Sequence, residues 1–335
     1  MKKLFSICIP TYNRAKELKK CLNSFIEDAA VLNIPIYIAN NHSTDETTIL
    51  LKQYQMKYPH IITIQTAPVT TNVDINMWKA LSMSETNYAL WLGDDDTLKP
   101  KALYTIIKSL QSMPDLCVLS IKQHPLQKEY QQLDKFFADF GMIGLNCSMH
   151  FSSLIVHVPS IKKVKNPLRY DGTLHLYAGV ILDYLANHIK NAKPISIITL
   201  PNLLDLATGE KRWAAKKGWI YLDFIPKWIS LLPDFYKKNP LTKKQIEKYY
   251  EMISNPLSFF KFLNLRETTF KNYPLNKILS WGPFYHIGRK EGKIFKLLGY
   301  WSYYKVRYAL YKLISNLSWG KLKYKCKKKI EKYRI

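Results

Sequence analysis

Short apolar runs alternate with amphipathic stretches over the first third of the chain. The run at residues 4–10 is nearly continuous, as in a strand buried on both faces, and the apolar positions of residues 18–26 recur at helical spacing. Strands that alternate with helices predict an α/β fold, with a mostly parallel sheet flanked by helices. The predicted strands of this part are residues 4–10, 34–39, 61–66, 88–92 and 116–121, and the predicted helices include residues 73–83 and a helix after Pro100.

A polar turn at residues 40–46 separates the second predicted strand from a helix that should run to about residue 58. Ser43 and Glu46 have the spacing of a capping box, in which each side chain accepts the backbone N–H of the other residue. The pattern therefore predicts that this pair starts the helix.

The alternation weakens after residue 121. A variable stretch at 122–146 precedes a predicted strand at 152–158, a helix at 174–188 and a strand at 195–200. Beyond Pro233 the composition shifts towards Lys, Tyr, Phe and Trp, with prolines as punctuation. We expect a core domain at 1–232, with halves at 1–120 and 121–232, and a helical, basic and aromatic region at 233–335.

The charge balance adds a constraint on partners. The 335 residues include 50 Lys and Arg against 25 Asp and Glu, a formal charge of +25, which indicates a negatively charged partner or surface. The five cysteines form no C-x-x-C pair, which fits a reducing compartment. We expect neither a signal peptide nor a spanning helix, because charges or prolines interrupt each apolar run.

The basic C-terminal part suits a membrane surface. Residues 294–319 mix aromatic side chains with Lys and Arg, and residues 321–335 carry eight basic residues against the single acidic Glu331. Such a segment is typical of an interfacial helix with a tail that binds an anionic membrane surface. The alternative is a helical subdomain that packs on the core. Nucleic acid is not expected, because no recognisable nucleic-acid module accompanies the charge.

Polar clusters follow three of the predicted strands. They are Thr11-Tyr12-Asn13-Arg14, residues 40–45, and Asp94-Asp95-Asp96. Ligands of open parallel sheets bind beyond the carboxyl ends of the strands. Three adjacent aspartates would repel one another unless a cation, or proton uptake, offset their charge, and hard oxygen ligands suit Mg²⁺ or Mn²⁺. The alternative is an acidic loop that caps the following helix.

These clusters resemble the successive motifs of family 2 glycosyltransferases with the GT-A fold. The similar stretches are Ser6-Ile7-Cys8-Ile9-Pro10-Thr11-Tyr12-Asn13-Arg14, Asn40-Asn41-His42-Ser43-Thr44-Asp45 and Leu92-Gly93-Asp94-Asp95-Asp96. The resemblance covers the first 120 residues or so and extends less clearly to about residue 217. It implies a GT-A nucleotide-diphospho-sugar transferase fold and an enzyme that uses a nucleotide-sugar donor.

The resemblance also implies roles for individual residues. Nucleotide-sugar contacts would come from Pro10, Thr11, Asn13, Arg14, Asn40, Asn41, Asp94 and Asp95, and the metal ligands would be Asp94, Asp95 and Asp96. Many members have two aspartates where this chain has Asn40 and Asn41. The contact to the base must then use amides, and the identity of the base stays open.

An inverting transfer needs a general base that takes the proton of the acceptor hydroxyl. The family places this base in the region of residues 170–175, where Asp171 and His175 are the candidates, with Asp171 favoured. The alternatives are a turn or cap residue for Asp171 and an ordinary helical histidine for His175. Arg212 and Trp213 resemble a mobile loop that meets the diphosphate and the sugar, although a solvated surface loop fits them as well.

The leading hypothesis is a metal-dependent glycosyltransferase of bacterial-type surface polysaccharide or oligosaccharide synthesis. It would move a sugar from a nucleotide-diphosphate donor to a lipid-linked or lipid-anchored glycan, at the cytoplasmic inner face of the cell membrane. The competing hypothesis is a non-catalytic protein that binds sugar nucleotides or serves as a membrane scaffold. A dinucleotide oxidoreductase is disfavoured, because no G-x-G-x-x-G follows the first strand.

Overall fold

The computed structural model describes residues 3–112, 118–120, 126–130, 151–191, 195–200, 202–206, 224–240, 242–244 and 246–247. The chain divides into a unit of residues 1–209 and 227–245 and a second unit of residues 210–226 and 246–335. Nearly all of the second unit lies outside the described residues, and the strands of the structure all belong to the first unit.

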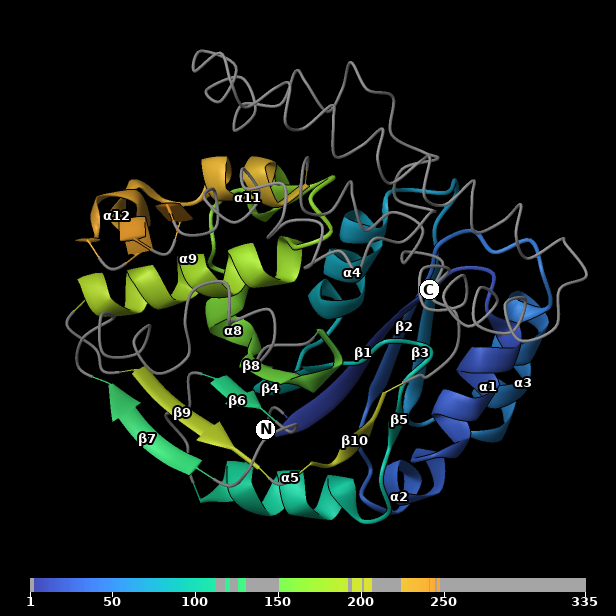
Figure 1. The fold of residues 1–335 in the computed structure, drawn as a ribbon. Coiled ribbons are helices and arrows are strands. Elements are labelled where there is room, and N and C mark those ends of the chain that lie inside the picture. Colours follow the sequence, from blue (N-terminus) through green and yellow to red (C-terminus); the bar gives the residue numbers. More distant parts are fainter. Residues whose placement is uncertain are drawn as a thin grey trace, which may run out of the picture. The chain divides into compact units, whose positions relative to one another are not determined.

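An eight-stranded sheet runs through this unit in the order β3-β2-β1-β4-β8-β6-β9-β7 (Figure 1). β1 pairs in parallel with β2 and β4, and β2 pairs in parallel with β3. β8 is antiparallel to both β4 and β6, and β7 is antiparallel to β9. β6 pairs in parallel with β9, so four of the seven strand pairings are parallel. The strands are β1 (Phe5–Thr11), β2 (Ile36–Asn40), β3 (Ile62–Thr66), β4 (Tyr88–Trp91), β6 (Val118–Ser120), β7 (Leu126–Tyr130), β8 (Leu154–His157) and β9 (Ile195–Thr199).

Helices cover both faces of the sheet (Figure 1). A two-stranded antiparallel sheet of β5 (Thr97–Leu98) and β10 (Leu204–Asp205) lies apart from the main one. The helices are α1 (Ala15–Asn23), α2 (Ile26–Val31), α3 (Thr47–Lys57), α4 (Val73–Ser82), α5 (Ala102–Gln111), α8 (Val158–Ile161), α9 (Leu176–Lys190), α11 (Ile225–Leu231) and α12 (Asp234–Lys238), with 3₁₀ helices η1 (Phe151–Ser153) and η2 (Pro167–Tyr170).

β1 forms the centre of the core. Ile7, Cys8 and Ile9 are all fully buried, as expected for a parallel strand covered on both faces. On one face, Ile7 and Ile9 join a cluster with apolar side chains of α1, α2, α3 and α5. On the other face the Trp91 indole N–H donates to the Met77 carbonyl of α4 over 2.9 Å. This burial fixes where each strand ends, and so where the polar loops begin.

The α/β prediction is confirmed, and the predicted strands and helices agree with the structure to within a few residues. The predicted capping box is wrong. α3 begins at Thr47 with no side-chain hydrogen bond from Glu46. Asp45 accepts the Thr47 N–H over 3.0 Å, and the Ser43 hydroxyl oxygen accepts the Asn13 N–H instead. Ser43 therefore joins two loops rather than starting a helix.

The expected boundary near Pro233 stays a prediction. α12 follows it and packs on the core, because the buried Tyr236 hydroxyl donates to the Leu182 carbonyl of α9. The basic aromatic region beyond residue 247 lies outside the described residues. Among the helices that are described, none combines the length and apolarity that crossing a bilayer requires.

Candidate functional site

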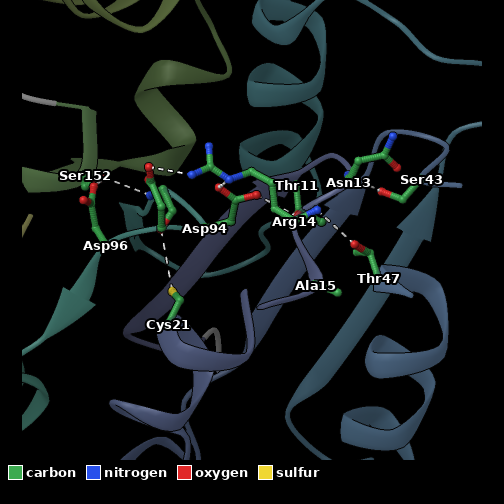
Figure 2. A network of polar contacts seen from close by, with 12 residues as sticks. Thr11, Asn13, Arg14, Ala15, Cys21, Ser43, Thr47, Asp94, Asp96 and Ser152 are labelled. Atoms are coloured by element: carbon green, nitrogen blue, oxygen red, sulfur yellow. Dashed lines mark hydrogen bonds and ion pairs between the residues drawn. The ribbon is translucent and has the colours of Figure 1, made fainter. Parts of the chain in front are cut away.

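Three polar loops meet at one edge of the sheet (Figure 2). They follow β1, β2 and β4, which pair in parallel. Thr11 and Asn40, the last residues of β1 and β2, are in register, whereas β4 ends at Trp91 in register with Cys8, so its loop begins before the end of β1. The three clusters singled out in the sequence therefore lie side by side, at the edge where open α/β sheets bind ligands.

Asp94 is anchored by the end of β1 and the loop that follows it. Its side chain is almost fully buried and accepts a 2.7 Å hydrogen bond from the Thr11 hydroxyl. Burial raises the pKa of Asp94 to about 7, although the positive charge of Arg14 acts in the opposite direction. The carboxylate therefore sits in a place where further positive charge would stabilise its ionised form.

Arg14 reaches two of the three carboxylates. Its Nη2 lies 2.8 Å from Asp95 Oδ2, and its Nε lies 3.4 Å from Asp94 Oδ1. One guanidinium thus bridges two carboxylates, which leaves a formal charge of about −1 when both are ionised.

Asp96 has a different partner. It is buried, and its carboxylate accepts a hydrogen bond from the Ser152 hydroxyl, whose oxygen in turn accepts the Gly93 N–H over 2.9 Å. Figure 2 shows Asp96 directed at Ser152 rather than at Arg14. A β-carbon at Gly93 would come within 2.9 Å of Ser152 Oγ, so the loop needs glycine here. Asp96 and Ser152 therefore shape the loop that presents Asp94 and Asp95.

The donor set is compatible with a hard divalent ion, because it consists of carboxylate oxygens with an uncompensated negative charge. Of these carboxylates, Asp94 and Asp95 would hold the ion in place of Arg14 or together with it. Across the described part of the chain, no three His, Cys, Asp or Glu side chains converge as a preformed metal site. Ligation by all three aspartates stays a prediction.

Asn40 and Asn41 lie at the site, but their amides are engaged within the protein. The buried Asn40 accepts the Ser43 N–H over 3.1 Å and donates to the Thr48 hydroxyl over 3.1 Å. Asn41 donates to the Thr71 carbonyl and accepts the Thr71 N–H, both over 2.8 Å. These bonds fix the loop after β2. A base contact through either amide would compete with them and stays a prediction.

Asn13 joins the loops after β1 and β2. Its amide oxygen accepts the Thr44 N–H over 2.7 Å, and its backbone has a φ of 52°, a left-handed conformation that asparagine tolerates. Pro10 is half-buried within β1, in register with Ala39. The nucleotide contacts expected of both residues stay predictions.

Asp171 lies directly after η2, in the loop that leads to α9. Its Oδ1 atom is buried and accepts no hydrogen bond within the described part of the chain. Its main-chain carbonyl accepts a 2.7 Å hydrogen bond from Lys227 Nζ. A carboxylate with an uncommitted oxygen on an anchored loop is suited to accept a proton.

His175 lies four residues further along the same loop. Its Nδ1 contacts the Thr173 carbonyl over 2.8 Å, and because a carbonyl only accepts, Nδ1 carries the proton. Burial lowers the pKa of His175, so the neutral ring has its lone pair on Nε2. The ring contacts those of Tyr177 and Trp228 at centroid distances of 6.2 and 6.1 Å.

Asp74, which no sequence pattern singled out, holds the loop that carries Asp171 and His175. Asp74 lies in the first turn of α4 and is fully buried. Its carboxylate accepts the N–H groups of Thr173, Leu174 and Leu176 over 3.0, 2.9 and 3.3 Å. The only local sign was an acidic residue early in a helix, which by itself predicts no partner a hundred residues away.

Arg212 and Trp213 lie outside the described residues. Their expected contacts to the diphosphate and the sugar stay predictions.

The burial of Asp74 predicts a pH dependence of stability. Burial, with a smaller contribution from the charge of Asp171, raises its pKa to about 6. A carboxyl whose pKa is raised by folding stabilises the fold fully below its unfolded pKa, and this stabilisation is lost as pH rises through 6. From pH 5 to 7.5 the free energy of unfolding should fall by about 1 kcal/mol through this group.

The measurement is urea unfolding of the wild type and of Asp74→Asn at both pH values. The advantage of the wild type over Asp74→Asn should be larger at pH 5 than at pH 7.5. Asp205→Asn, an exposed change of the same charge, serves as the control. Parallel pH profiles of the wild type and Asp74→Asn would contradict the expectation.

Part of the chain is similar in sequence to a known protein family and to known relatives. The model of the family described as Glycosyl transferase family 2 matches residues 6–160. The abequosyltransferase RfbV of Salmonella typhimurium strain LT2 is 27% identical over 268 residues, which cover 73% of this chain and 79% of that protein. The uncharacterized glycosyltransferase YibD of Escherichia coli strain K12 is 26% identical over 113 residues, which cover 34% of this chain and 32% of that protein.

A solved structure has the same fold. The mannosyltransferase PcManGT from Pyrobaculum calidifontis, in complex with GDP-Man and Mn²⁺, superposes with a TM-score of 0.54 at 12% identity, covering 85% of this chain and 83% of the other. At this identity the likeness concerns the fold alone. The match over residues 6–160, the glycosyltransferase relatives and the shared fold together show a family 2 glycosyltransferase domain in this part of the chain.

Proposed function

We propose that this glycosyltransferase moves one sugar from a nucleotide-diphosphate donor to a lipid-linked or lipid-anchored glycan during synthesis of a bacterial-type surface polysaccharide. The observation that carries the proposal is the group of Thr11, Arg14, Asp94 and Asp95 at the carboxyl ends of β1 and β4. The relative from Salmonella typhimurium is named an abequosyltransferase, which supports sugar transfer as the reaction.

The donor would lie along the edge formed by the loops after β1, β2 and β4. The loop of Pro10, Thr11 and Asn13 and the loop of Asn40 and Asn41 would hold the nucleoside, and Asp94 and Asp95 would hold Mn²⁺ or Mg²⁺. The bound ion would supply Lewis-acid stabilisation of the diphosphate charge. The PcManGT complex with GDP-Man and Mn²⁺, which has the same fold, supports a divalent ion in this role.

Asp171 would be the general base of a single displacement. The acceptor oxygen bonds to C1 of the sugar from one face while the bond from C1 to the diphosphate oxygen breaks on the other, which inverts the anomeric carbon. The proton of the acceptor hydroxyl passes to Asp171. The uncommitted Oδ1 of Asp171 and its position on a loop fixed by Asp74 support this role. His175 Nε2 is the second candidate.

A membrane-bound acceptor would place the enzyme at the cytoplasmic face of the membrane as a peripheral protein. The formal charge of +25 and the basic residues after 321 support contact with an anionic surface. Those residues lie outside the described part of the chain.

A nucleotide screen tests the proposed donor and metal. UDP, GDP, CDP and dTDP are each added with and without Mn²⁺, and the melting temperature is followed. One nucleotide should raise it by several degrees, and mainly when Mn²⁺ is present, because ligands that bind only the folded state stabilise it. Asp95→Asn should remove the part of the rise in melting temperature that depends on Mn²⁺, whereas the control Asp205→Asn should keep it. Absence of a shift with every nucleotide would overturn the proposal.

Substitution of the two base candidates tests the mechanism. With the donor found in the screen and detergent-extracted bacterial membranes as acceptor, Asp171→Asn should lower turnover by about 10²–10⁴-fold. The dissociation constant of the donor should stay unchanged, because the base acts on the acceptor. His175→Gln is the matched comparison, and its turnover should fall less than that of Asp171→Asn. A larger loss in His175→Gln would move the base to the histidine.

Sedimentation with vesicles tests the membrane proposal. The full chain should bind vesicles that contain phosphatidylglycerol and should be released by salt, because surface charge attraction is screened. A chain that ends at residue 293 should bind much less. Equal sedimentation of both chains would contradict a membrane role for the C-terminal part.

A further inference from the structure

Arg14 contacts Asp94 and Asp95, the two carboxylates proposed to hold the metal ion. Its Nη2 pairs with Asp95 at 2.8 Å and its Nε with Asp94 at 3.4 Å. Its backbone is held separately, since the Arg14 N–H donates to the Thr47 hydroxyl oxygen over 3.1 Å. The side chain can therefore move while the loop stays in place.

The pairing with Asp94 is incomplete. The Arg14 Nε atom is buried and makes no hydrogen bond, although it lies within ion-pair distance of Asp94 Oδ1. A guanidinium in its best arrangement forms two parallel hydrogen bonds with one carboxylate. Here it is spread over two carboxylates, and 30% of its side chain is exposed. The contact neutralises charge but leaves Nε without a hydrogen bond, and the partly exposed guanidinium could turn to a second anion.

A divalent ion and the guanidinium would compete for the same oxygens. Both are cations, and both would be held by Asp94 and Asp95, which Thr11 and the Gly93 loop keep in place. Two cations a few ångströms apart repel each other in a partly buried site. An anionic diphosphate removes this conflict, because it can accept the guanidinium while the ion takes the carboxylates.

We propose that Arg14 is an exchangeable internal counter-ion, which pairs with Asp94 and Asp95 in the free enzyme, weakens binding of the metal alone, and transfers to the donor diphosphate when metal and nucleotide bind together. The inference rests on the proposed metal and donor. It goes beyond them because it makes Arg14 an obstacle to the metal in one state and a partner of the donor in the other.

The test is binding of Mn²⁺, followed by the loss of the electron paramagnetic resonance signal of free Mn²⁺. Without nucleotide, Arg14→Gln should bind Mn²⁺ about tenfold more tightly than the wild type, because the competing charge is gone. With UDP or GDP present, the order should reverse, because Arg14→Gln lacks the partner of the diphosphate.

Three further variants locate the effect. Arg14→Lys should gain less affinity for Mn²⁺ than Arg14→Gln, because an ammonium is a point charge that bridges two carboxylates poorly. If Arg14→Gln does not fold, Arg14→Lys tests the inference in its place. Adding Asp95→Asn to Arg14→Gln should remove the gain. Lys99→Gln, which removes a surface charge paired with Asp205 at 3.7 Å, should bind as the wild type does.

The inference is overturned if Arg14→Gln and Arg14→Lys bind Mn²⁺ alone no more tightly than the wild type. It is also overturned if Lys99→Gln gains as much Mn²⁺ affinity as Arg14→Gln. It is also overturned if Arg14→Gln stays the tighter binder when nucleotide is present. Failure of the wild type and every variant to bind UDP or GDP, with the Mn²⁺ gain intact, would instead contradict the proposed donor site and leave Arg14 as a competitor of the metal.

Discussion

The candidate site depends on a buried negative charge at the end of β4. Asp94 lies in the interior because β4 pairs in parallel with β1 and is covered on both faces. An isolated buried carboxylate costs several kcal/mol, so Thr11 and Arg14, which follow from the end of β1, must stand beside it. The same contacts bring the loops after β1 and β4 together. The site is thus a consequence of how the sheet accommodates this charge.

The first turn of α4 links this donor edge to the loop of the proposed base. Asn76 donates to the carbonyls of Thr11 and Ala39 over 3.4 and 3.0 Å, at the ends of β1 and β2. Asp74, two residues earlier, accepts the N–H groups of the loop before α9. Two buried polar side chains of one helical turn therefore hold the strand ends and the Asp171 loop in fixed relation. Donor binding and removal of the acceptor proton would both depend on this arrangement.

The sequence predicts the strands well, because a parallel strand buried on both faces leaves a continuous apolar run that ends where the polar loop begins. It also locates Asp94 and Thr11, which directly follow or end such runs. It fails where a side chain binds a segment far away in the chain. The side-chain amide of Asn41 donates to Thr71, and the carboxylate of Asp74 accepts from Thr173 and Leu174. No local sequence pattern indicates either contact. Ser43 misleads for the same reason, since Asn13 is its partner.

A crystal structure with a nucleoside diphosphate and Mn²⁺, with diffraction recorded at the manganese absorption edge, would show directly whether the acidic loop holds the metal. We expect an anomalous peak within bonding distance of Asp94 or Asp95 oxygens, about 2.0–2.3 Å by analogy with other hard divalent ions. We also expect the Arg14 guanidinium to lie on the diphosphate. A manganese peak away from both carboxylates, or a nucleotide bound elsewhere on the protein, would contradict the proposed donor and metal site.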